Sequence, residues 1–220
     1  MWRNIVVKEQ NHLGVRTGLM LLGILLIGLC VAFFRIAGFG VDPFTCMNLG
    51  ISSFIGWLFG TWQLAANTMI LVVVFFTVRN CIGLGTIINM VFVGYIADGV
   101  CWLVQDVLKA EPGILLRIVS LTVAMLFASV GVALYMKADM GIAPYDSVAV
   151  MIEKATKKIP FHIGRVISDI TVIVIGVMFC LLAGKSIWTV IGAGTVCNAL
   201  FNGPLIQFFR SKIDQMLSQL

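Results

Sequence analysis

Charged residues are scarce in this chain: Asp, Glu, Lys and Arg make up only 11% of its 220 residues, whereas 60% are apolar. Three segments, residues 17–34, 43–77 and 118–136, carry no charge at all. A soluble domain could not expose such segments without aggregating, so a soluble globular protein is excluded. A membrane-spanning helix needs about 20 apolar residues, and we therefore predict an all-α integral membrane protein.

Recognisable catalytic and metal-binding patterns are also missing. The sequence has no H-E-x-x-H, no G-x-S-x-G and no P-loop, and none of its six cysteines stands in C-x-x-C spacing. We therefore predict no enzymatic activity, no cofactor and no metal, and we interpret the cysteines as small apolar residues in helix packing. The net charge of +5 comes from basic residues dispersed at predicted helix ends, which indicates membrane topology and not nucleic-acid binding.

The sequence contains an internal repeat. The segments Gly85–Gly94 and Gly194–Gly203 both read G-T-h-h-N-h-h-F-x-G, where h is apolar. Gly40–Phe44 and Gly141–Tyr145 match earlier in each half as G-h-x-P-aromatic. Duplicated membrane segments with broken helices are a known way to build a binding site at the bilayer midplane.

This repeat divides the chain. We assign residues 1–105 to a first membrane repeat, 106–114 to a connector, 115–212 to a second membrane repeat and 213–220 to a cytoplasmic tail. The first 16 residues are too polar for a signal peptide, so we expect no cleaved targeting signal, and we expect no separate soluble domain.

Each half contains a short apolar piece that follows a proline, Pro43 or Pro144. Each piece has about 15 residues, or roughly 22 Å as a helix, which is short of a hydrocarbon core of about 30 Å. If the pieces do not cross the membrane, the chain crosses six times and the halves are inverted; if they do, it crosses eight times and the halves are parallel. Length favours two homologous halves, each of three transmembrane helices plus one short broken or re-entrant helix, arranged as inverted repeats.

The basic residues predict the orientation. With a cytoplasmic N-terminus and six crossings, only Arg35, Lys109, Arg117 and Lys185 lie outside. The positive-inside rule therefore predicts cytoplasmic N- and C-termini. The count for eight crossings is equally asymmetric, so charge does not decide between the two topologies.

Polar residues inside apolar helices mark the candidate binding site, because they are costly in a bilayer. Asn89 and Asn198, with Thr86 and Thr195, belong to the duplicated motif. We predict that they line a substrate pocket between the halves; the alternative is that the two asparagines only form interhelical hydrogen bonds. On a helical wheel Phe92 shares their face, which we expect to point into the protein.

The starts of the short helices, Pro43 and Pro144, and the neighbouring Asp146 complete the predicted substrate site. A helix N-terminus within the membrane presents free N–H groups to an anionic ligand, although Asp146 could equally be an ordinary cap. Asp169 is the proton-coupling candidate; the alternative is a structural i, i+4 pair with Arg165.

The motif Lys137–Asp146, its degenerate partner at Ala37–Phe44 and the two G-T-h-h-N segments resemble the YczE/YyaS/YitT family of bacterial membrane proteins. The resemblance covers nearly the whole chain and is nearer to the YczE-like branch, since the soluble C-terminal domain of many YitT-like members is absent. It implies location in the bacterial cytoplasmic (inner) membrane and no established activity, so no catalytic residue is transferred.

The duplicated architecture leads us to expect a small secondary transporter or exporter of a small organic solute. The alternatives are a ligand-binding subunit of a multi-component importer and a non-transporting accessory membrane protein. The expected partners are the lipid bilayer and an unidentified small-molecule solute, with a homo-oligomer left open.

Overall fold

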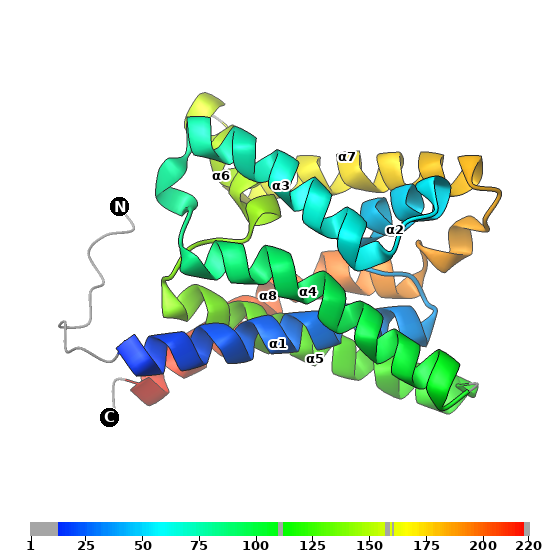
Figure 1. Cartoon of the computed structure of the whole chain (residues 1–220). Coiled ribbons are helices and arrows are strands. Elements are labelled where there is room, and N and C mark those ends of the chain that lie inside the picture. Colours follow the sequence, from blue (N-terminus) through cyan, green and yellow to red (C-terminus); the bar gives the residue numbers. More distant parts are fainter. Residues whose placement is uncertain (1–12, 110–111, 157–158, 160, 218–220) are drawn as a thin grey trace.

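The computed structural model describes residues 13–109, 112–156, 159 and 161–217, and the regular structure of this part is entirely helical (Figure 1). The elements, in chain order, are α1 (Leu13–Ala37), α2 (Pro43–Ile55), α3 (Phe59–Thr77), the 3₁₀ turn η1 (Arg79–Cys81), α4 (Leu84–Trp102), the π-turn η2 (Leu103–Val107), α5 (Ile114–Ala138), α6 (Pro144–Thr156), α7 (Phe161–Leu182), the 3₁₀ turn η3 (Ile187–Thr189) and α8 (Ala193–Leu217).

Five of the described helical segments are long and apolar enough to cross a membrane: α1, α3, α4 with η2, α5, and α7 from Ile163. The predicted all-α membrane protein is thereby confirmed. α8 has 25 residues, contains Pro204 and is not among these five. The helix also continues to Leu217, into the segment that the sequence analysis treats as a tail.

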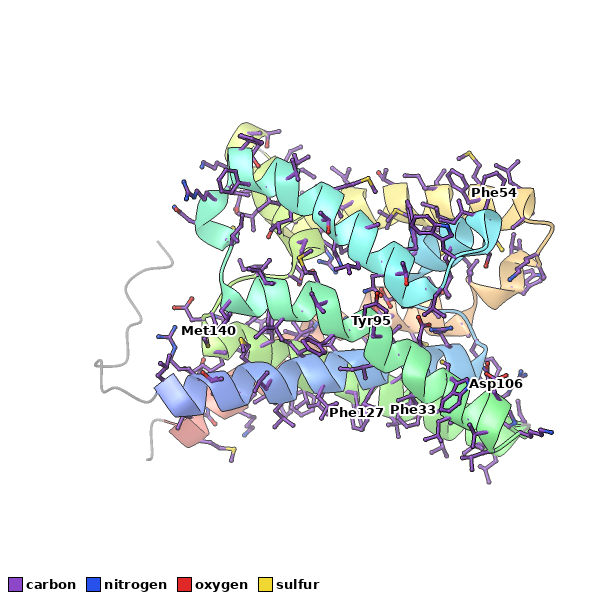
Figure 2. All side chains as sticks on the ribbon, in the orientation of Figure 1. Phe33, Phe54, Tyr95, Asp106, Phe127 and Met140 are labelled. Carbon is purple, nitrogen blue, oxygen red and sulfur yellow. The ribbon has the colours of Figure 1, made fainter. Side chains whose placement is uncertain are left out.

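The centre of the molecule is the pair α1 and α5, which run side by side in opposite directions (Figure 1). Gly23 and Gly131 make this close approach possible: a Cβ on Gly23 would lie 2.8 Å from the carbonyl oxygen of Gly131. Small residues at helix contacts are the usual basis of packing in membranes, where lipid tails leave no hydrophobic drive between helices. Phe33 of α1 and Phe127 of α5 also contact each other edge to face, with ring centroids 5.8 Å apart (Figure 2).

The remaining helices pack around this pair. α4 lies against α1 and α3, and α8 lies against α5. The short helix α2 packs on α7, and the short helix α6 packs on both α3 and α7. Each short helix therefore contacts a helix from the opposite half of the chain.

The outer faces are apolar, as expected where lipid surrounds the protein. Phe76 is 81% exposed, and Phe92 on α4 is 53% exposed. The expectation that Phe92 shares an inward face with Asn89 was wrong, because the helix turns its small residues towards its neighbours and its bulky aromatic outwards.

Candidate functional site

The duplicated Gly-Thr motif forms two matching junctions between the halves. In one, Thr86 near the start of α4 donates to the Ile142 carbonyl at 2.9 Å and accepts from the Gly83 N–H at 3.1 Å. Backbone bonds flank this hydroxyl, from Gly85 N–H to the Met140 carbonyl at 2.8 Å and from Ile142 N–H to the Cys81 carbonyl at 2.9 Å.

The second junction repeats the backbone bonds between the halves, and its threonine bonds within its own half. Thr195 near the start of α8 accepts from the Gly192 N–H at 3.3 Å and donates to the Val190 carbonyl at 3.4 Å. Gly194 N–H donates to the Phe39 carbonyl at 2.7 Å, and Val41 N–H donates to the Val190 carbonyl at 3.1 Å. Thr86 thus bonds to the loop that precedes the short helix α6, whereas Thr195 bonds to the loop that precedes α8.

Glycine is required in both loops that precede the short helices. Gly40 and Gly141 have φ values of +91° and +119°, which side chains disfavour. A Cβ on Gly40 would lie 2.5 Å from the Thr195 hydroxyl, and a Cβ on Gly141 would lie 2.4 Å from the Thr86 hydroxyl. The two repeated motifs therefore meet each other, the glycine of one half touching the threonine of the other.

Asn89 and Asn198 are buried, at 7% and 6% exposure. They lie on α4 and α8, which pack on opposite members of the central pair. Neither lines the cavity described below. Their role as substrate ligands stays a prediction.

The two short helices begin at the predicted prolines. Pro43 and Pro144 are the first residues of α2 and α6, where a missing N–H and a fixed φ suit helix initiation. Asp42 caps α2 by accepting from the Thr45 N–H at 3.0 Å, and Asp146 lies in the first turn of α6. The helix starts also touch each other, because the rings of Phe44 and Tyr145 stack with centroids 4.5 Å apart.

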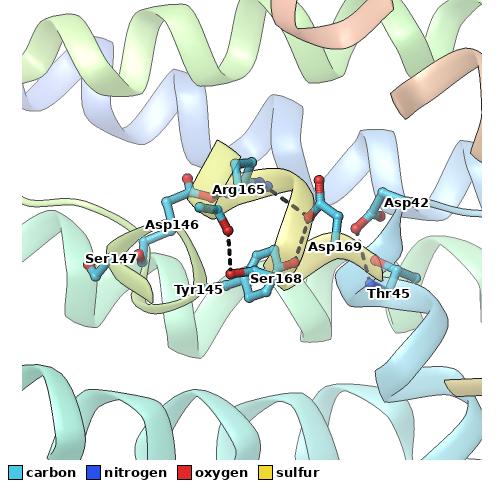
Figure 3. Close-up of polar contacts among 10 residues, drawn as sticks. Asp42, Thr45, Tyr145, Asp146, Ser147, Arg165, Ser168 and Asp169 are labelled. Atoms are coloured by element: carbon cyan, nitrogen blue, oxygen red, sulfur yellow. Dashed lines mark hydrogen bonds and ion pairs between the residues drawn. The ribbon is translucent and has the colours of Figure 1, made fainter. Parts of the chain in front are cut away.

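Beside this stacked pair lie four charged side chains, Asp42, Asp146, Arg165 and Asp169, which together with Tyr145 we call the Arg165 cluster (Figure 3). Arg165 on α7 forms ion pairs with Asp146 of α6 and, at 3.3 Å, with Asp169 one turn along its own helix. The Tyr145 hydroxyl donates to Asp169 at 2.5 Å, and the Arg165 guanidinium lies 4.6 Å from the centroid of the Tyr145 ring.

The cluster is not sealed inside the protein. The Arg165, Asp146 and Asp169 side chains are 33%, 28% and 23% exposed. Charges within a membrane protein normally face the interior or an aqueous cavity and mark functional pathways. The structural pair of Asp169 with Arg165 is present, and Asp169 also contacts Tyr145, so its predicted part in proton coupling remains a hypothesis.

A cavity of about 550 Å³ lies between α2, α3, α6 and α7. Phe44 and Tyr145 both line it, and its other walls are almost wholly apolar; they are Met47, Ile51, Trp62, Ala66, Met69, Ile70, Val148, Ile152, Ile167, Ser168, Thr171, Val172 and Ile175. This size is typical of small-molecule sites. The indole N–H of Trp62 is buried and has no hydrogen-bond partner within the described part of the chain.

Sequence reasoning found the separate parts of this site but not their assembly. Asp146, Asp169, Pro43 and Pro144 were candidates, whereas the pairing of Arg165 with Asp146 and the stacking of Phe44 on Tyr145 were not expected. The aromatic after each proline was the one available signal, because its repetition puts a ring at both helix starts. Most cavity walls carry no signal, since apolar residues such as Ile and Val occur throughout the chain.

The five long apolar helices define a membrane protein that crosses the bilayer several times. Residues 14–211 match the model of a family described as a family of unknown function, DUF6198, and the chain belongs to this family.

The chain is also similar to curated relatives. It is 24% identical over 198 residues to an uncharacterized protein of Haemophilus influenzae, covering 90% of this chain and 84% of that protein. It is 22% identical to the uncharacterized protein YyaS of Bacillus subtilis, covering 88% and 92%, and 22% identical to the uncharacterized membrane protein YczE of the same organism, covering 81% and 77%. The resemblance drawn from the motifs is thereby confirmed. No solved structure matches the chain.

Proposed function

We propose that the protein is a small secondary transporter or exporter of a small organic solute, built from two inverted repeats that share one binding cavity. The carrying observation is that Tyr145, at the start of a short helix, lines the 550 Å³ cavity with its ring and bonds to Asp169 of the Arg165 cluster with its hydroxyl. Broken helices that start within the membrane and present polar groups to a cavity are the usual construction of transporter sites.

Three observations support the inverted repeat. α1 and α5, α3 and α7, and α4 and α8 run in opposite directions pairwise (Figure 1). The backbone hydrogen bonds that join the halves at one Gly-Thr junction are repeated at the other. Many cavity residues also come in pairs at matching spacing: Phe44 and Tyr145, Met47 and Val148, Ile51 and Ile152, Ala66 and Ser168, Met69 and Thr171, Ile70 and Val172.

The orientation in the inner membrane follows from charge. α1 begins and α8 ends at the same end of the bundle (Figure 1). The ends of α3, α5 and α6 lie there too, which brings Arg79, Lys137 and Lys154 to this end, whereas Arg35 and Lys185 belong to the other. The positive-inside rule then makes this end cytoplasmic. The 13-residue short helices, about 20 Å long, enter the core without crossing it.

The test is a thermal-shift screen of purified protein against a metabolite library, followed by uptake of each stabilising solute into proteoliposomes. Ser168→Phe, which fills the cavity, should remove both stabilisation and uptake. Phe92→Trp, on the exposed face of α4, is the matched control and should leave both unchanged. Asn89→Leu with Asn198→Leu tests the asparagines in the same assay; unchanged uptake removes them from the site.

The other outcomes separate the alternatives. Tight binding without uptake, together with co-purifying ATPase and scaffold subunits, would identify an importer-binding subunit. No stabilisation by any solute would contradict the transporter proposal and favour an accessory protein.

A further inference from the structure

The charges of the site determine the class of solute that it accepts. Resting on the proposed function, we infer that the cavity binds a monovalent organic cation with apolar substituents, which exchanges for one proton held by the Arg165 cluster.

The helix starts argue against an anion. At the start of α2 the Asp42 carboxylate already accepts from the Thr45 N–H, and the first turn of α6 carries the negative charge of Asp146. An anionic solute at either helix start would be repelled by the carboxylate that lies there, and at α2 it would also compete with Asp42 for an N–H donor.

The charge count leaves the cluster negative. Asp42, Asp146 and Asp169 face one cation, Arg165, with which two of them form ion pairs. Each helix N-terminus adds roughly +0.5 of an elementary charge, so two helix starts and one guanidinium offset about two of the three carboxylates. One proton or one bound cation completes the balance.

Among the described residues, the cation that acts on both Asp42 and Asp169 is Arg165. Asp169 faces Arg165, Tyr145, Asp42 and Asp146. The further titratable neighbours of the carboxylates are neutral as protonated groups: the thiols of Cys30 and Cys46 beside Asp42, and the hydroxyl of Tyr135 near Asp146. The described parts of α2 and α3 contain no charged side chain.

The cavity walls define the rest of the solute. Tyr145 is common to both parts of the site: its ring lines the cavity and its hydroxyl bonds to Asp169. Phe44 and Trp62 add aromatic faces, and aromatic faces attract desolvated cations. Apolar groups of the solute fill the space bounded by side chains such as Met47 and Ile152.

Exchange follows because proton and cation neutralise the same carboxylates. When the cation enters, the proton leaves to water, and the charge of the site stays constant. Apparent affinity for the cation must then rise with pH.

The experiment measures binding of three probes of similar shape to the full chain in detergent, at pH 6 and pH 8, by tryptophan fluorescence and calorimetry. The probes are benzyltrimethylammonium, its uncharged carbon isostere neopentylbenzene, and phenylmethanesulfonate. We expect the ammonium probe to bind at least tenfold more tightly than the sulfonate, to gain about tenfold in affinity between pH 6 and pH 8, and to release close to one proton.

Variants locate the effect. Asp169→Asn should weaken ammonium binding at least tenfold and abolish its pH dependence. Asp139→Asn is the matched control, because the Asp139 side chain is 94% exposed, outside the cluster, and asparagine tolerates its φ of +49°. It should bind like the unsubstituted protein.

The failures are distinguishable. Tighter binding of the sulfonate or of the isostere, or pH-independent ammonium binding, would overturn the cation inference and leave the transporter proposal standing. Absence of binding by all three probes would overturn the inference as well, and the metabolite screen then decides the proposed function. The wild-type comparison of probes holds even if Asp169→Asn fails to fold.

Discussion

The two halves of the chain carry different residue types at matching positions around the short helices. In the second half the residues around the short helix are Tyr145, Asp146, Arg165 and Asp169; the first-half residues at matching spacing are Phe44, Thr45, Gln63 and Asn67. Thr45, Gln63 and Asn67 are 2%, 5% and 3% exposed, whereas the charged side chains are about a quarter to a third exposed. Charge is kept where side chains remain accessible, and neutral polar groups stand where the protein closes over them, because burial of an ion is far more costly than burial of an amide.

This contrast indicates that the two halves have different roles in the site. The second half supplies Asp146, Arg165 and Asp169 to the cluster, whereas the first half supplies Asp42 and holds neutral residues at the matching positions. The substitutions below exchange features between the halves or compare matched positions.

The largest effect is expected from Arg165→Gln, which copies the first half into the second. Asp146 and Asp169 lose their counterion, and breaking such a partly buried network should lower the free energy of unfolding by about 3–5 kcal/mol. Thermal unfolding in detergent measures this. The triple variant Asp146→Thr, Arg165→Gln, Asp169→Asn reproduces the neutral set and should recover most of the loss; an equally unstable triple variant would refute the ion-pair explanation.

The helix contacts offer the next comparison. A Cβ on Gly50 would lie 2.2 Å from the Gly176 carbonyl oxygen, where α2 meets α7. The positions at matching spacing, Met151 and Val74, carry side chains. Gly50→Ala should destabilise by about 1–3 kcal/mol, because the overlap is with backbone that cannot move aside freely.

The control is Gly56→Ala, since a Cβ there meets no neighbour within 4 Å but suffers from a φ of +72°. It reports the conformational part alone, about 1 kcal/mol. A larger loss at Gly56 than at Gly50 would show that the α2–α7 contact tolerates the added methyl group.

Tyr145→Phe makes the two stacked rings identical. It removes the hydrogen bond to Asp169 and leaves the stack with Phe44 in place. A hydrogen bond to a charged acceptor contributes about 1.5–3 kcal/mol, so stability should fall by at most that amount. Phe44→Tyr is the reverse exchange. It should not raise stability, because the position that matches Asp169 holds the uncharged Asn67, and a gain in stability would contradict this explanation.

The smallest difference is expected between the two junctions. The Thr86 hydroxyl bonds to the Gly83 N–H at 3.1 Å and to the Cys81 carbonyl at 3.3 Å, and the matching bonds of Thr195 are 3.3 and 3.4 Å. Thr86 also donates to the Ile142 carbonyl of the other half at 2.9 Å. Thr86→Val should therefore destabilise by about 1–2 kcal/mol and Thr195→Val by about half as much. Equal melting temperatures for the two variants would show that bond length does not rank these junctions.

Much of the fold could be predicted from local patterns. Runs such as residues 17–34 and 118–136 lie inside the long helices α1 and α5, because an uncharged apolar run of this length has no other stable state in a bilayer. Pro43 and Pro144 begin the short helices because proline fixes φ and lacks the N–H that a first turn leaves unpaired.

The candidate site was only partly predictable. The contact between Arg165 and Asp169 follows from their spacing of one helical turn. The second partner of Arg165, Asp146, lies 19 residues away on another helix. Asn89 and Asn198 drew notice because amides are rare in apolar helices, yet the cavity lies among ordinary Met, Ile and Val side chains. Composition identifies polar residues that are unusual in apolar helices. It does not predict where the apolar surfaces of packed helices enclose a cavity.

By itself the sequence determined a helical membrane protein with a repeated motif and two proline-initiated short helices, because hydrophobic length and backbone geometry act locally. Only the tertiary structure decided that the Gly-Thr motifs join opposite halves, that Phe44 stacks on Tyr145, and that Asp146 and Asp169 both pair with Arg165. These contacts depend on how helices that are distant in sequence cross each other. The crossing is set by close packing at residues such as Gly50 and Gly176, which involves two segments at once and so cannot be inferred from either one.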